Sequence, residues 1–102
     1  MSDRTESVDV DSEVLRLRSM GRAFARISKE LGLERGADAQ RAFQRAVRGL
    51  PASERQRVRG EEVSRLDRLA DRVRADTTKG ELDRARQLKT IDRMRSQMLE
   101  DA

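Results

Sequence analysis

Apolar residues recur every three or four positions along most of this chain, the spacing that places them on one face of an α-helix. Residues 22–31 predict a helix whose inner face carries Phe24, Ile27 and Leu31. Residues 37–50 predict another helix, whose apolar side consists of Ala39, Ala42, Phe43, Ala46, Val47 and Leu50. No segment has the alternating pattern of a strand, and β-branched and aromatic residues are sparse. We therefore expect an all-α protein.

The chain before these helices is polar. Residues 1–10 show no apolar periodicity and are expected to form a disordered acidic segment. Asp11 or Ser12 can cap a first helix whose apolar side is supplied by Val14, Leu15 and Leu17. Residues 11–50 are therefore predicted to be a three-helix domain.

Pro51, the single proline, marks a boundary because proline cannot continue a helix. Residues 53–100 predict two long helices that form an antiparallel hairpin, with residues 76–80 as the connection. Only 35% of the residues are hydrophobic, so a monomer would have a thin core and we expect oligomerisation. The residues assigned to the hairpin core and the oligomer contacts are Val63, Leu66, Leu69, Val73, Leu88, Ile91, Met94 and Met98.

Composition narrows the possible functions. The chain has no Cys and no His, which excludes disulfides, metal sites built on those residues and His-dependent catalysis. We expect no enzyme activity, no cofactor and no metal. Asp67 and Asp71 lie one helical turn apart and could hold a divalent cation, but the neighbouring Arg68 and Arg72 disfavour this. No apolar run is long enough to span a membrane, and the acidic N-terminus is unlike a signal peptide, so a cytoplasmic location is expected.

Positive charge is concentrated in the middle of the chain. Residues 14–50 contain nine basic and three acidic residues, whereas the net charge of the whole chain is only +4. Such a concentration indicates a polyanionic partner.

The same region has the sequence form of a helix-turn-helix, in which the second helix enters the major groove of DNA. Gly32 lies between the two helices, and Leu33 follows as a buried turn residue. The usual spacing would place the first anchor of the second helix at Asp38, so either the turn is longer or the helix starts differently. A structural interpretation, in which the exposed arginines only solvate a helical domain, remains open.

If the segment binds double-stranded DNA, its polar side chains divide into two groups. The outer face of the second helix would enter the groove, where arginine pairs with guanine and glutamine with adenine. This groove-facing set is Arg41, Gln44, Arg45 and Arg48. The set expected to bind phosphates is Arg22, Arg26, Lys29 and Arg35.

The order of parts resembles the small terminase subunit of tailed bacteriophages. The hairpin carries the similarity, through the sequence RLDRL at 65–69, GELDRA at 80–85, and Leu88, Ile91, Asp92, Arg93 and Met94. The resemblance covers roughly residues 14–100. It implies a homo-oligomer, ring-shaped in this family, that recognises viral DNA for packaging in a bacterial host cell. It further implies that a large subunit with ATPase and nuclease activity is recruited.

Two other functions are compatible with the sequence. A phage or bacterial transcriptional regulator would use the hairpin to dimerise on paired half-sites. An adaptor without DNA affinity would use the hairpin to bind the helices of another protein.

Overall fold

The computed structural model describes residues 3–100, with side chains described from Val10 to Glu100. Over this range the protein is all-α, as expected, and contains no strand. Its helices are α1 (Asp3–Ser19), α2 (Phe24–Leu31), α3 (Gly36–Arg48), α4 (Ala52–Ala75) and α5 (Glu81–Glu100). They form two compact units, Met1–Leu50 and Pro51–Ala102, which are described separately.

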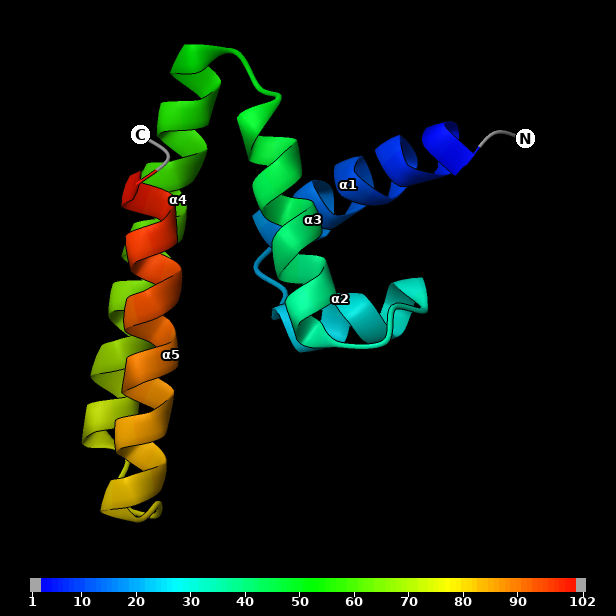
Figure 1. Ribbon diagram of the computed structural model, residues 1–102. Helices are drawn as coiled ribbons and strands as arrows, with labels where there is room; N and C mark the ends of the chain where they lie inside the picture. Colours follow the sequence, from blue (N-terminus) through cyan, green and yellow to red (C-terminus); the bar gives the residue numbers. More distant parts are fainter. Residues whose placement is uncertain (1–2, 101–102) are drawn as a thin grey trace. The chain divides into compact units, whose positions relative to one another are not determined.

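In the first unit, α1 and α2 both pack against α3 (Figure 1). Val14 and Ile27 are completely buried, and Phe43 on α3 is 2% exposed. The rings of Phe24 and Phe43 lie 5.5 Å apart between centroids and are tilted by 59°, a favourable aromatic geometry that joins α2 to α3. The predicted apolar faces of these helices therefore form one core.

The connection between α2 and α3 is fixed by polar groups. Gly32 has φ +72°, a left-handed conformation that glycine adopts without a steric penalty, and it ends α2. The N–H of Leu33 then donates to the Ser28 carbonyl at 2.8 Å. The buried hydroxyl of Ser28 donates to the carbonyl of Arg35, just before α3 begins.

The start of α3 explains the unusual spacing of the turn. The Asp38 carboxylate accepts a hydrogen bond from the Arg35 backbone N–H at 3.0 Å and thereby caps the helix. A Cβ atom built on Gly36, the first helical residue, would lie 3.4 Å from the Ala25 backbone, so the two helices approach closely here. Asp38 therefore caps α3, and Ala39 is the completely buried anchor.

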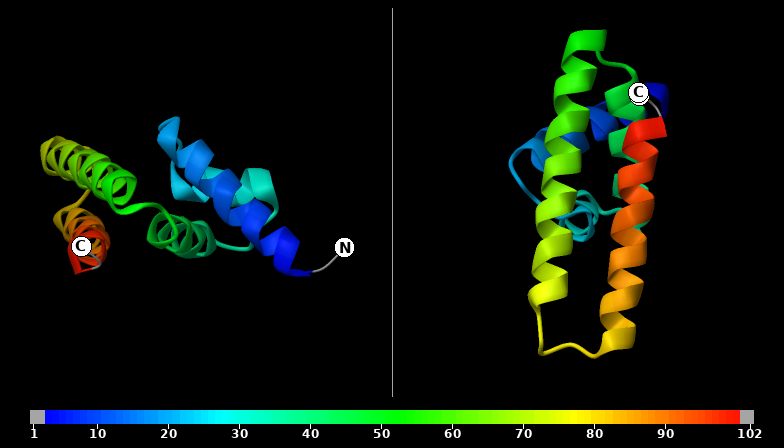
Figure 2. Two further views of the ribbon diagram at one scale, coloured as in Figure 1. Left: turned by 90° about the horizontal axis from the view of Figure 1, so that it is seen from above. Right: turned by 90° about the vertical axis from the view of Figure 1, so that its left-hand side faces the viewer.

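In the second unit, α4 and α5 lie side by side and run in opposite directions (Figure 2). Their shared core consists of Leu66, Ala70, Val73 and Ile91, with Leu88 and Met94 packed against it. Arg95 on α5 donates to Asp67 on α4 at 2.9 Å, which adds a polar link. In the connection, hydrogen bonds from the hydroxyl and N–H of Thr78 hold the pKa of Asp76 below its usual range.

The structure differs from the sequence-based expectation at the N-terminus. Residues 3–10, expected to be disordered, belong to α1, which begins at Asp3. Residues 3–10 contain no Pro or Gly, the residues that most strongly oppose a helix, so the helix can continue to Asp3. Residues 1–2 lie outside the described residues. Within the range described, no helix is long and apolar enough to cross a membrane.

Candidate nucleic-acid interface

The outer side of α3 carries a stripe of three arginines. Arg41, Arg45 and Arg48 follow one another at spacings of four and three residues, which places them along one side of the helix. All three are exposed, whereas Ala39, Phe43 and Val47 face the core. Gln44, the fourth residue assigned to this face, is half-buried beside the stripe. We call Arg41, Arg45 and Arg48 the arginine stripe.

Arg41 is paired with a carboxylate of its own helix. Its guanidinium contacts Asp38 Oδ1, while Asp38 Oδ2 accepts the capping hydrogen bond from Arg35. The Arg41 side chain is nevertheless 60% exposed. The pair therefore faces water, where such contacts contribute little stability.

Arg45 is held from a different helix. Its Nε donates to Asp11 Oδ2 at 3.0 Å, and its Nη2 donates to Asp11 Oδ1 at 2.9 Å. Both carboxylate oxygens of Asp11, on α1, therefore bind one edge of the guanidinium. The hydrogen bonds that Arg45 donates to the Asp11 carboxylate raise the pKa of Arg45 further above its already high value. Asp11, expected only as a candidate helix cap, thus lies within α1 and contacts the stripe.

The residues expected to contact phosphate lie on or beside α2. Arg22 and Arg26 both reach Glu30, at 2.6 Å and 3.3 Å. Lys29 and Arg35 are exposed, and among the described residues neither forms an ion pair. Arg26, Lys29 and Glu30 also line a hollow with Ala25.

The structure gathers these cations into two groups. Glu30 joins Arg22 to Arg26 on the α2 side, and the stripe follows α3; within residues 10–100, no ion pair connects one group to the other. Arg18, which contributes to the basic charge of this region, is buried. Its guanidinium lies 4.0 Å from the Phe24 ring centroid and donates to the Arg22 carbonyl at 2.9 Å, so it belongs to the core.

The residues assigned to the hairpin core and oligomer contacts fall into two groups according to their burial. Leu66, Val73, Ile91 and Met98 are buried in the folded chain, so they serve mainly its core. Val63, Leu88 and Met94 are half-buried, and Leu69 is 36% exposed.

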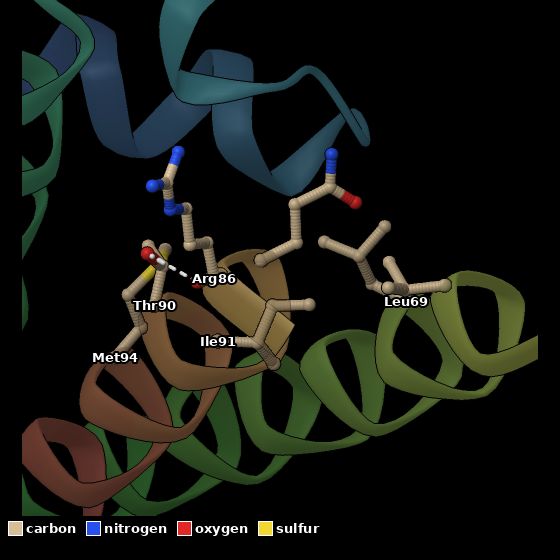
Figure 3. A pocket seen from close by; sticks show the side chains of 7 residues that line it. Leu69, Arg86, Thr90, Ile91 and Met94 are labelled. Atoms are coloured by element: carbon tan, nitrogen blue, oxygen red, sulfur yellow. Dashed lines mark hydrogen bonds between the residues drawn. The ribbon is translucent and has the colours of Figure 1, made fainter. Parts of the chain in front are cut away.

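An apolar hollow of about 320 Å³ opens on the surface of the hairpin. Figure 3 shows Leu69 of α4 on one side, Met94 and Thr90 of α5 on the other, and Ile91 between them. The Thr90 hydroxyl donates to the Arg86 carbonyl at 3.1 Å, so its proton is used within α5. The hollow is therefore lined mainly by hydrocarbon groups.

The two aspartates considered above as a cation site both pair with arginines. Asp67 binds Arg95 and Asp71 binds Arg74, and no group of three or more potential metal ligands is present in that range. No protein-family model matches the chain, and no curated protein or solved structure matches it either.

Proposed function

We propose that this protein binds double-stranded DNA through α2 and α3 and that it self-associates through the α4–α5 hairpin. The observation that carries the proposal is the arginine stripe of Arg41, Arg45 and Arg48, exposed on a helix whose opposite side is packed into the core. A helix presented in this way fits the width of the major groove.

The construction of the turn supports a helix-turn-helix. In that motif the angle between two short helices must be fixed, because it decides whether the second helix can enter the groove. Gly32, the buried Ser28 hydroxyl and the Asp38 cap fix the connection, and the small residues Ala25 and Gly36 allow close packing. These contacts preorganise α3, so binding would require little additional ordering of the backbone.

The ion pairs on this surface are compatible with a polyanionic partner. Arg26 and Arg41 are 73% and 60% exposed, and exposed pairs are worth only about 0–1 kcal/mol. A DNA phosphate accepts the same charge-assisted hydrogen bonds as a carboxylate. The arginines can therefore exchange Glu30 and Asp38 for phosphate at small cost.

The limited core of the hairpin supports the proposed self-association. On α5, only Ile91 and Met98 are buried among the described residues, while Leu82 and Leu99 are exposed. A second copy of the chain seated on the hollow at Leu69 would bury part of this surface. Several copies would array several α3 helices on one DNA, which raises the avidity of a small domain.

The proposed type is a small terminase subunit that recognises viral DNA and recruits a large subunit. A dimeric transcriptional regulator is the alternative. Native mass spectrometry separates them, since a ring of many subunits supports the first type and a stable dimer the second.

The stripe is tested by changing two arginines and measuring DNA affinity. Arg41→Ala/Arg48→Ala is expected to weaken binding to a fluorescein-labelled duplex about tenfold or more at low salt, because a good arginine contact contributes about 1–3 kcal/mol. Binding is read by fluorescence anisotropy at several salt concentrations, and circular dichroism checks the fold.

The matched control is Arg72→Ala/Arg74→Ala, which removes the same charge from exposed positions on α4. It should retain most of the affinity. Equal losses in both variants would show that only net charge matters. If the wild type binds no duplex at low salt, DNA binding is excluded and the adaptor function is favoured.

A further inference from the structure

The pair between Asp11 and Arg45 differs from the other ion pairs on this surface. Two nearly parallel hydrogen bonds, of 3.0 Å and 2.9 Å, fix the Nε–Nη2 edge of the guanidinium to both carboxylate oxygens. The partners come from α1 and α3, which the core already holds together. The position of Arg45 is therefore set by tertiary structure and not by its own helix.

Solvent exposure distinguishes this pair from the pairs formed by Asp38 and Glu30. The Asp11 side chain is 18% exposed, compared with 31% for Asp38 and 32% for Glu30. Because a shielded carboxylate loses more when its partner leaves, Asp11 holds its arginine more firmly than the other two do. On DNA binding we therefore expect Arg45 to keep its carboxylate partner, whereas Arg26 and Arg41 exchange theirs for phosphate.

The remaining donors of Arg45 then have a defined direction. A guanidinium has five N–H groups in a planar fork, and Asp11 occupies the donors of one edge. The Arg45 side chain is 51% exposed, and its other edge, formed by Nη1 and Nη2, is not part of the contact with Asp11. Two N–H groups side by side on a planar edge match the O6 and N7 acceptors of guanine in the major groove.

We infer that Asp11 is a positioning residue for base recognition: it holds Arg45 so that the Nη1–Nη2 edge reads a guanine in the bound DNA. This inference rests on the proposed function. Arg45 then discriminates between DNA sequences. The arginines that can exchange their carboxylate partners for phosphate contribute affinity for DNA of any sequence. Asp11 also cancels the charge of Arg45, so the pair adds little to nonspecific attraction.

The test first selects duplexes from a random pool with the wild-type protein and with Arg45→Ala. The guanine whose selection depends on Arg45 is then replaced by 7-deazaguanine, which lacks the N7 acceptor. Wild-type affinity is expected to fall about tenfold on this replacement. Arg45→Ala should show no such loss, and Asp11→Asn should show at most a twofold loss.

Two controls separate positioning from charge and from folding. Glu13 lies on the same helix as Asp11, but its carboxylate pairs with Arg16. Glu13→Gln removes this carboxylate and should keep the full tenfold discrimination. Asp11→Glu retains a carboxylate and should retain more discrimination than Asp11→Asn. The discrimination ratio compares two duplexes on the same folded protein, so a partial loss of folded material does not change it.

Three results would overturn the inference. Asp11→Asn could keep wild-type discrimination, or it could strengthen binding to every duplex equally, which would make Asp11 a competitor of DNA. It could also weaken binding to every duplex equally, which would place Arg45 on a phosphate. Each of these leaves DNA binding itself intact, whereas a wild type that binds no duplex removes the proposed function as well.

Discussion

Ser28 and Asp38 are the side chains that make the turn between α2 and α3 a defined structure. Ser28 is 3% exposed and donates its hydroxyl proton to the Arg35 carbonyl, and the Asp38 carboxylate accepts a hydrogen bond from the Arg35 N–H. Both ends of one residue are thus fixed by side chains from two helices. The turn owes its geometry to these polar contacts as much as to Gly32.

Gly32 gives a prediction at this scale. Gly32→Ala should lower the free energy of unfolding of the first unit by about 1 kcal/mol, because a side chain disfavours φ +72° even though its Cβ would meet no atom within 4 Å. Gly60→Ala is the matched control, since Gly60 lies inside α4 and its Cβ would also meet nothing. It should raise stability by up to about 1 kcal/mol. Urea unfolding measures both, and changes of the same sign would contradict the backbone explanation.

Residue types alone predict part of this chemistry. The Gly32 turn and the apolar anchors Phe24, Ile27 and Phe43 are visible in the sequence because local spacing determines them. The contact between Asp11 and Arg45 joins residues that are 34 positions apart, so no local pattern reveals it. Arg18 is similar, since its burial against Phe24 depends on how α1 meets α2.

At the scale of helices, the start of α1 shows what hydrophobic periodicity can detect. Periodicity identifies a helix through its buried face, and residues 3–10 contain only Val8 and Val10 as apolar side chains. The helix nevertheless continues to Asp3. Elsewhere, Gly32, Pro51 and Gly80 stand next to helix ends and mark them in the sequence. The apolar positions of α5 are spread around the helix and do not form one narrow face. Their spacing therefore could not distinguish the buried Ile91 from the exposed Leu82.

The hairpin surface gives a second prediction. Leu69→Glu should reduce the mass of the assembly in native mass spectrometry, because it places a charge at the rim of the apolar hollow without entering the core. Leu82→Glu makes the same change at a residue that is 65% exposed and outside the hollow, and it should leave the mass unchanged. Equal effects of both variants, or a wild type that is monomeric at micromolar concentration, would reject the hollow as the contact.

At the scale of the whole molecule, the distribution of charge decides which partner fits. The distribution of charged residues along the sequence identifies the basic region. In the structure, the cations of this region lie in three kinds of environment. Arg18 is buried, Arg45 is fixed by a shielded carboxylate, and others, such as Arg26 and Arg41, form exposed pairs. The sum of charges describes the attraction for a polyanion only at the exposed pairs. Water screens these pairs, and a polyanion can replace their carboxylate partners.

DNA binding through α2 and α3 is tested most directly by an NMR titration of the ¹⁵N-labelled protein with a DNA duplex at low salt. Chemical-shift changes are expected at the backbone amides of α3 and at the Nε–H groups of Arg41, Arg45 and Arg48. Shift changes should also occur along the exposed side of α2, around Arg26 and Lys29. Shift changes confined to α4 and α5, or no change on adding DNA, would contradict binding through α2 and α3.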